Sequence, residues 1–399
     1  MRFGKATALF FVWFASGTAL AGERMTFDAF LTKVNDQNLG LKIEAAKAEA
    51  SRENAKGLSI PPPMVGYVRM TDQSGSSANG FEINQMIPFP SKISNDRSAR
   101  KFEAEAQEEA RLGMTSEIFA QARVLYLSLW VSQQKKEALK EKKGVIEDHI
   151  KLARAGVRSD SFLRIHLLKS ESDLDFMENE ILSADQEILE KEITVAKFLN
   201  VDPGSFHPLL EEPSLITLPP EDTAAPSHQF ESARLSLESF RAREQEAKSV
   251  WFPDLYLRYK ETGETRLMPR LSEVMIGVSL PFVFPWNASA TAGKSSALKV
   301  QAEFEFEKEK RKIDSEKSTF FVRAISLKKQ IDNIKQKLIP RAEKRMKLVH
   351  NLAPRDMETL QDHRDTMEAF PDLKLKALDL RVQYETAVAE LRKYMRDQK

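Results

Sequence analysis

Apolar and polar residues alternate with a period of two in four short stretches of this sequence. The clearest example places Phe81, Ile83 and Ile87 on one face of an extended chain, with Glu82 and Asn84 on the other. This period is typical of β-strands, because successive side chains of a strand point to opposite faces. The four stretches are 64–71, where the alternation is weakest, 81–89, 255–260 and 274–282.

These stretches form two pairs, and each pair encloses a segment with turn-forming residues, at 72–77 and around Gly263. The sequence therefore predicts two β-hairpins, at about 64–90 and about 254–284. Their strands, of roughly 9–11 residues, have the length that a tilted strand needs to cross a lipid bilayer.

The stretch that follows the first predicted β-hairpin carries apolar residues at helical spacings of three, four and seven. No proline occurs between Lys92 and Pro203, and the pattern is interrupted once, from Ala155 to Asp160. These spacings are typical of a coiled-coil seam. We therefore expect a long helical hairpin at about 92–200, with a first helix on the order of 95 Å long.

A second long helical hairpin is expected at about 287–395, where apolar residues recur at similar spacings. Its two helices are predicted at about 287–350 and 356–395, and two prolines, Pro340 and Pro371, fall inside them. Proline lacks the amide hydrogen that a helix interior requires. We therefore expect each proline to interrupt and kink its helix.

The order of helix, β-hairpin and long helical hairpin occurs twice along the chain. Pro61 follows Ala55-Lys56 in the first copy as Pro253 follows Ala247-Lys248 in the second. A repeat of this kind indicates two tandem copies of one structural unit. The expected segments are a first repeat at 22–200 with a helical lead-in at 26–57, a connector at 201–226, and a second repeat at 227–399 that opens with a helix at about 227–250.

The first residues are typical of an export signal. Arg2 and Lys5 precede an apolar run from Ala6 to Leu20, and Ala19-Leu20-Ala21 forms an A-x-A cleavage site before Gly22. This order predicts a cleavable secretory signal peptide at 1–21, with an uncleaved N-terminal anchor as the alternative. No later segment has a long uncharged apolar run, so any insertion of the mature chain into a membrane is expected to use β-strands.

Composition and charge exclude several classes of function. The 399 residues include 60 Lys and Arg against 59 Asp and Glu, without a one-sided basic block, so we expect no nucleic-acid partner. The chain has no cysteine, which excludes disulfides, thiol catalysis and cysteine-ligated zinc. The six histidines show no paired ligand spacing and no catalytic motif is present, so we expect no metal site, no cofactor and no enzymatic activity.

The predicted strands cannot form a closed structure within one chain. Membrane barrels begin at about eight strands. Open strand edges are not tolerated in hydrocarbon, where each unpaired backbone group costs several kcal/mol. If the strands insert, several copies of the chain must share one barrel, and three copies begin to leave a lumen. Long helices extending from such a barrel would form a tube, so the sequence predicts an exported conduit.

The alternative is a periplasmic coiled-coil adaptor or scaffold that stays soluble, with a small sheet capping its helices. An adaptor would need one helical hairpin flanked by compact β-rich domains, whereas this sequence predicts two helical hairpins and about four strands. Recovery of the protein from the soluble periplasm, rather than from the outer membrane, would favour this alternative.

The repeated order of elements resembles the TolC-like outer-membrane efflux proteins over about 25–395. The segment from Gln85 to Lys92 is similar to the strand-to-helix corner of the CzcC-like, heavy-metal-efflux branch of that family, with Ser91 where a glycine is usual. The segment from Phe198 to Pro203 is similar to the family's exit from the first helical hairpin, with Asn200 in place of a glycine.

The resemblance implies a mainly α fold with a small β part, in which a long α-helical coiled-coil barrel extends from four membrane β-strands per chain. It implies a homotrimeric α/β-barrel in the outer membrane of a Gram-negative bacterium, with most of each chain in the periplasm. The implied partners are outer-membrane lipid, a periplasmic adaptor protein and, through the adaptor, an inner-membrane pump of the RND or ABC type. Such a protein is the passive exit duct of a tripartite efflux or type I secretion system.

Three groups of candidate site residues follow. By the resemblance, the turns between the long helices dock the adaptor, and ordinary helical corners without a partner are the alternative. Asp362 aligns with an acidic position of the family's pore constriction, and a solvated helix face is the alternative. Arg258 and Lys260 should face the lumen, because a charge that faces lipid at mid-bilayer costs roughly 2–4 kcal/mol. The tip residues are Gly156, Val157, Arg158, Ser159, Ala353, Pro354 and Arg355.

Overall fold

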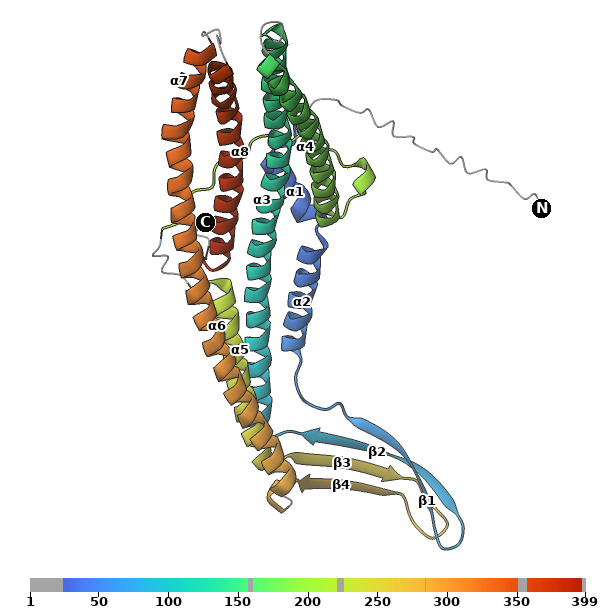
Figure 1. Cartoon of the computed structure of the whole chain (residues 1–399). Helices are drawn as coiled ribbons and strands as arrows, with labels where there is room; N and C mark the ends of the chain where they lie inside the picture. Colours follow the sequence, from blue (N-terminus) through green and yellow to red (C-terminus); the bar gives the residue numbers. More distant parts are fainter. Residues whose placement is uncertain (1–23, 157–160, 221–225, 284, 351–356, 397–399) are drawn as a thin grey trace, which may run out of the picture.

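The computed structural model describes residues 24–156, 161–220, 226–283, 285–350 and 357–396. Long helices run side by side along most of the molecule, and a small β-sheet projects at one end (Figure 1). The α-helices are α1 (Phe27–Gln37), α2 (Leu39–Lys56), α3 (Pro90–Gly156), α4 (Ser161–Leu199), α5 (His228–Lys248), α6 (Pro285–Asn333), α7 (Ile339–His350) and α8 (Met357–Lys393). Within the described residues, no helix is apolar over the length that a membrane crossing requires.

The β-sheet has four antiparallel strands that lie in sequence order. They are β1 (Met64–Thr71), β2 (Ser77–Ile87), β3 (Leu255–Thr262) and β4 (Leu271–Val278). Both predicted β-hairpins form, and β2 of the first hairpin pairs with β3 of the second, with Ile83 opposite Tyr259. The sheet therefore joins two parts of the chain that lie far apart in the sequence, and β1 and β4 are its outer strands.

The last strand is shorter than the sequence pattern predicts. The alternation continues to Phe282, but β4 ends at Val278 and a 3₁₀ turn, Pro281–Val283, precedes α6. Pro281 has no amide hydrogen to donate to a neighbouring strand. The amide of Ser279 makes the last bond across the hairpin, to the carbonyl of Asp254.

The lead-in expected at 26–57 consists of two helices, α1 and α2, which are separated at Asn38. The Asn38 side chain accepts a hydrogen bond from the amide of Leu41 at 3.2 Å and donates one to the carbonyl of Phe198 at 2.9 Å. One buried side chain therefore caps the start of α2 and also holds it to the end of α4.

The spine of the molecule is α3, with α2, α4, α5 and α8 packed along it. Its 67 residues begin at Pro90, and proline suits a first helical position because the amide there has no partner within the helix. The predicted apolar seam of α4 faces α3. Met177 of that seam is buried with Ile146 and Ile150, and Val195 belongs to the larger core around α1 and α3.

The second long helical hairpin consists of α6, α7 and α8. A π-helical segment, Ile334–Leu338, joins α6 to α7 directly before Pro340. Because Pro340 has no amide hydrogen to donate, the regular bonding pattern fails there, and the wider π turn occupies the irregular stretch. The interruption predicted at Pro371 is not found, since α8 continues through this residue without a break.

The connector crosses the helices of both repeats (Figure 1), and buried polar side chains fix it there. The Tyr126 hydroxyl on α3 lies 2.9 Å from the carbonyl oxygen of Glu211. On α8, Arg381 donates to a connector carbonyl and pairs with the fully buried Glu385, which Arg123 of α3 contacts at 2.7 Å. The connector therefore links the two long helical hairpins to each other.

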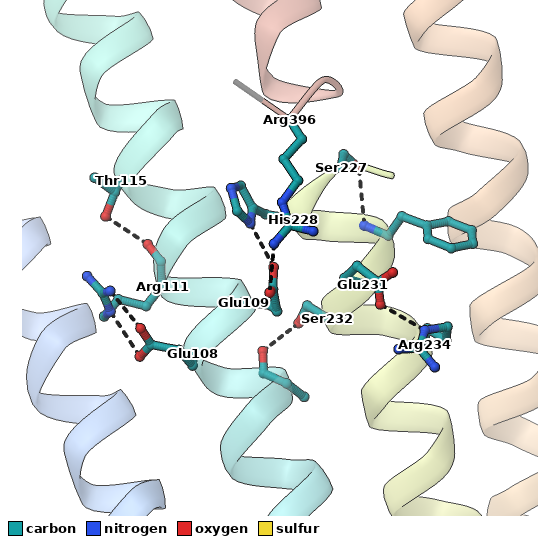
Figure 2. Close-up of polar contacts among 12 residues, drawn as sticks. Glu108, Glu109, Arg111, Thr115, Ser227, His228, Glu231, Ser232, Arg234 and Arg396 are labelled. Carbon is teal, nitrogen blue, oxygen red and sulfur yellow. Dashed lines mark hydrogen bonds and ion pairs between the residues drawn. The ribbon is translucent and has the colours of Figure 1, made fainter. Parts of the chain in front are cut away.

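The first helix of the second repeat, α5, lies along α3 and is fixed there by polar contacts (Figure 2). Ser227 caps α5 by accepting a hydrogen bond from the amide of Phe230. Nδ1 of His228 lies 2.7 Å from one carboxylate oxygen of Glu109 on α3, and Arg396 lies 3.5 Å from the other. One carboxylate on α3 thus holds both the start of α5 and the segment that follows α8.

Candidate functional site

The two faces of the sheet differ in polarity, and the strand register determines which residues share a face. Arg258 lies opposite Asn84, and Lys260 lies between Glu82 and Glu273. Nη2 of Arg258 is 2.9 Å from Oε2 of Glu82, so an ion pair joins two strands on this face. Arg258 and Lys260 thus share one charged face with two carboxylates. Their exposure to a lumen stays a prediction.

The other face of the sheet is apolar and exposed. Val274 is 72% exposed and Ile276 is 69% exposed. Apolar surface of this extent on a soluble protein usually marks an interaction site. Its apolar residues are Val65, Tyr67, Phe81, Ile83, Ile87, Leu255, Leu257, Tyr259, Val274, Ile276 and Val278. Gln85 lies among them, and the polar residues Arg69, Asn79, Glu261 and Ser272 lie on the same face toward the loops.

Both outer strands have an unpaired edge. Among the residues that the structure describes, β1 is paired only with β2, and β4 only with β3. A free strand edge presents a row of amide and carbonyl groups that can pair with another strand. The sheet can therefore be extended on both sides by strands from other chains.

One carboxylate ties together the loops at the far end of the two β-hairpins. Oδ1 of Asp72 accepts hydrogen bonds from the amides of Ser74 and Ser76 at 2.8 and 3.0 Å, and Oδ2 accepts one from the amide of Leu267 at 3.1 Å. Hydrogen bonding, foremost from the Ser74 side chain, lowers the pKa of Asp72 to about 2, because the donors stabilise the charged form. The sequence predicts a turn here but not the contact with the second loop.

The corner between β2 and α3 is fastened to the second β-hairpin. Nζ of Lys92 lies 2.7 Å from Oδ1 of Asp254, and the amide of Phe89 donates to the same oxygen at 2.9 Å. The rings of Phe89 and Phe252 stack with their centroids 4.8 Å apart. The buried hydroxyl of Ser91 has no hydrogen-bond partner in the described part of the chain. This corner joins the two repeats where the sheet meets the helices.

The helices α3, α4, α7 and α8 all have an end at the part of the molecule farthest from the sheet (Figure 1), and the predicted docking tips lie between these ends in the sequence. Gly156 is the last residue of α3. Two residues earlier, Nη2 of Arg154 lies 2.8 Å from Oε1 of Glu171, which fastens α3 to α4. The predicted tip residues that lie outside the described residues are Val157, Arg158, Ser159, Ala353, Pro354 and Arg355.

Asp362 lies near the start of α8, and its side chain is exposed. This placement fits a solvated helix face as well as an aperture, so the constriction at Asp362 stays a prediction. Nowhere in the described residues do three or more His, Asp or Glu side chains form a group that could hold a metal ion.

A buried polar layer lies below the tips, where α3, α4 and α8 meet. Nη1 of Arg364 on α8 is 2.8 Å from Oδ2 of Asp173 on α4. His149 of α3 is 3% exposed, and neither of its ring nitrogens has a hydrogen-bond partner among the described residues. Burial, followed by the charge of Arg364, lowers the pKa of His149 to about 4. The sequence did not reveal this layer, because a lone histidine in a helical pattern gives no sign of burial.

Comparison with known proteins identifies the fold. The sequence matches no protein-family model and no curated protein. The structure is similar to the outer membrane channel CmeC of Campylobacter jejuni, with a TM-score of 0.74 and 13% identity, covering 99% of this chain and 93% of CmeC. It is also similar to the open MtrE outer membrane channel of Neisseria gonorrhoeae, with a TM-score of 0.74 and 12% identity, over 92% and 88% of the two chains. The outer-membrane channel OprN matches with a TM-score of 0.74 and 13% identity, over 92% and 89%.

These similarities cover nearly the whole chain, including both long helical hairpins and the sheet. The chain therefore has the fold of the TolC-like outer membrane factors, as the repeated order of elements in the sequence predicts. The structures that it resembles are those of channels rather than of enzymes. The particular resemblance to the heavy-metal-efflux branch stays a prediction.

Proposed function

We propose that this protein is the outer-membrane exit duct of a tripartite efflux or type I secretion system. In this role it is a passive channel that spans the outer membrane and the periplasm. The observation that carries the proposal is the sheet, with its exposed apolar face, its charged face and its two unpaired edges. A strand that separates lipid from a water-filled lumen needs this division into two faces.

The unpaired edges support assembly into a homotrimer. In hydrocarbon each free amide or carbonyl costs several kcal/mol, so β1 and β4 require strands from neighbouring copies. Three copies would supply twelve strands, enough to leave a lumen. The 67 residues of α3 would extend about 100 Å from the membrane into the periplasm. Removal of the signal peptide at 1–21 would precede this assembly.

We infer that the helix tips dock a periplasmic adaptor, which would connect the duct to an inner-membrane pump of the RND or ABC type. The proposed contact residues are Gly156, Val157, Arg158 and Ser159 at the first tip and Ala353, Pro354 and Arg355 at the second. Val157→Asp and Arg158→Glu should abolish co-purification with the adaptor and leave the trimer intact. Unchanged co-purification would argue against docking at the first tip.

Three copies of Asp362 would form a ring of carboxylates at the narrow end of the tube. Such a ring attracts cations and would bind a blocking multivalent ion. The conductance of the trimer should therefore be blocked by multivalent cations, and Asp362→Asn should relieve the block. A block that is unchanged in Asp362→Asn would rule out this residue as the constriction.

Cell fractionation and conductance measurements test the proposal as a whole. We expect the protein in the outer-membrane fraction, dependent on detergent for extraction, and conducting ions in planar bilayers. The alternative is a soluble periplasmic adaptor or scaffold without membrane insertion. Recovery of a soluble periplasmic protein that conducts no ions would support this alternative and contradict the duct.

A further inference from the structure

A cavity of about 700 Å³ lies between α3, α4 and the connector. It is found where the connector turns back beside the end of α4 (Figure 1). A volume of this size is typical of sites that hold small organic molecules, in which apolar side chains surround a few polar groups. The residues that line this cavity therefore indicate which kind of molecule it can hold.

The connector wall of the cavity is held in place by hydrogen bonds. The Gln133 side chain on α3 donates to the carbonyl of Pro208 at 2.8 Å and accepts from the amide of Leu210 at 3.3 Å. The amide of Met25 donates to the carbonyl of Leu209 at 2.8 Å. Leu210 packs in the core, whereas Leu209 is 63% exposed. This wall is formed by the chain itself, so a ligand would not have to order it.

One buried carboxylate lines the cavity without a permanently charged partner. Glu192 of α4 is 6% exposed, and its hydrogen-bond partner within the described residues is Nδ1 of His207, at 2.6 Å. The His207 ring is charged only when it is protonated. Burial of a carboxylate is costly unless a counter-charge compensates for the lost water. The cavity therefore offers a place for a cation beside Glu192.

The other charged side chains of the lining do not supply this cation. Nζ of Lys136 lies 2.5 Å from Oδ1 of Asp185, and Nζ of Lys140 lies 2.8 Å from Oε1 of Glu137. Both of these carboxylates are thus paired with lysines. Arg24 also lines the cavity, but it is exposed and makes no ion pair in the described part of the chain. The buried carboxylate is left as the charged group that a ligand would meet.

Exposed apolar side chains form another part of the lining. Leu189 of α4 is 51% exposed and lines the cavity together with Leu209 of the connector. Covering such side chains stabilises a complex, because apolar surface is removed from water. A ligand that satisfies the whole lining therefore has an apolar body and one cationic group.

We propose that this cavity binds an organic ammonium ion, with its nitrogen at Glu192 and its apolar body on Leu189 and Leu209. An ammonium group forms charge-assisted hydrogen bonds with a carboxylate, and these are stronger than bonds between neutral groups. An anionic ligand would meet Glu192 with the same charge and is disfavoured. The inference goes beyond the proposed duct, because the residues that form the site all belong to one copy of the chain.

Three probes with one apolar body and different head groups test the recognition of charge. They are adamantylammonium, adamantanol and adamantanecarboxylate. Isothermal titration calorimetry with the full-length mature protein in a non-ionic detergent should show binding of the ammonium at neutral pH, and much weaker binding of the other two. Equal affinity for the ammonium and the alcohol would show that the cavity recognises only apolar surface, and would overturn the proposal.

Variants of the lining test the assigned carboxylate. Glu192→Gln should weaken binding of adamantylammonium by roughly 30-fold or more, as expected when a buried charged partner is lost. His207→Lys should also abolish binding, because the new side chain would bring a permanent ammonium group to Glu192. Glu187→Gln is the matched control, since Glu187 pairs with Lys191 on the same helix outside the cavity, and it should bind like the wild type.

Two outcomes of these titrations would overturn the inference. The first is undiminished binding of adamantylammonium by Glu192→Gln, which would place the ligand elsewhere. The second is absence of binding by the wild-type protein, as would follow if a neighbouring copy filled the cavity. Either outcome leaves the proposed duct standing, because conduction through the duct does not require this cavity.

Discussion

Individual residues of the sheet determine which face can contact lipid. Val274 lies on the apolar face in the middle of β4, and Val68 lies on the charged face in the middle of β1. Val274→Lys would place a charge in hydrocarbon at a cost of roughly 2–4 kcal/mol. We expect it to reduce the amount of protein assembled in the outer membrane, as measured by fractionation. The matched variant Val68→Lys places its charge in water and should assemble normally, so equal loss in both variants would contradict the assignment of the faces.

Asp72 gives the loops at the end of the sheet a defined pH dependence. Its pKa in the folded loop is about 2, below the ordinary value of 3.8, so the folded loop favours the charged carboxylate. The charged Asp72 carboxylate therefore stabilises the folded loops fully above pH 3.8, and this stabilisation is lost as the pH falls toward 2. At neutral pH, Asp72→Asn should lower the hydrogen-exchange protection of the Ser76 and Leu267 amides several-fold. Equal protection in wild type and variant would show that the carboxylate does not hold the two loops together.

At the scale of elements, the link between the two helical hairpins depends on Glu385. Its carboxylate is fully buried between Arg123 and Arg381, which also hold the connector. Removing one partner of a buried ion pair typically costs 3–5 kcal/mol, because the remaining charges stay buried. Glu385→Gln should therefore markedly lower the thermal unfolding temperature. Glu307→Gln, which breaks an exposed pair with Arg311, serves as the control and should leave the unfolding temperature nearly unchanged.

The buried layer around His149 predicts a second pH dependence. Protonation here adds a positive charge to a buried ring, whereas protonation of Asp72 removes a negative charge. Groups that face this ring include Arg364 and His363 from α8 and His166 and Asp173 from α4. The packed layer favours the neutral His149 ring. Its contribution to the free energy of unfolding is therefore fully present above pH 6.5, and it decreases as the pH falls from 6.5 toward 4. The total loss is on the order of 3 kcal/mol, at 1.36 kcal/mol per pKa unit.

Hydrogen exchange of the amides near Asp173 and Arg364 measures this effect. Wild-type protection should decrease between pH 6.5 and 4 beyond the intrinsic change in exchange rate. His149→Leu should remove that decrease, whereas His207→Gln, at an exposed histidine of the connector, should preserve it. A decrease that persists in His149→Leu would assign the pH dependence to another group.

Periodicity allowed the elements of this fold to be predicted, because each element repeats one local pattern. The period of two located both β-hairpins, and the α4 seam correctly indicated packing on α3. The end of β4 was predicted too late, because apolar alternation continues past the point where Pro281 prevents pairing. Pro371 was predicted to interrupt α8, but the helix accommodates it.

The candidate site was only partly predictable. Alternation along β3 placed Arg258 and Lys260 on one face, and the register adds their carboxylate neighbours on β2 and β4. The contact of Asp72 with the second loop and the burial of His149 depend on segments far apart in the sequence. Local patterns carry no information about such contacts, so only the fold reveals them.

At the scale of the whole molecule, one chain is an incomplete structure. Among the described residues its sheet has two unpaired edges and an exposed apolar face. In the proposed duct, strands from further copies of the same chain would pair with these edges, and lipid would cover the apolar face.

The number of chains in the purified, detergent-solubilised protein tests the central claim most directly. Analytical ultracentrifugation or native mass spectrometry of the mature protein gives this number. The account predicts three chains per particle, and aggregation once the detergent is removed. A single chain that remains dissolved in plain buffer would contradict the account, because its exposed sheet would then need neither lipid nor sister strands.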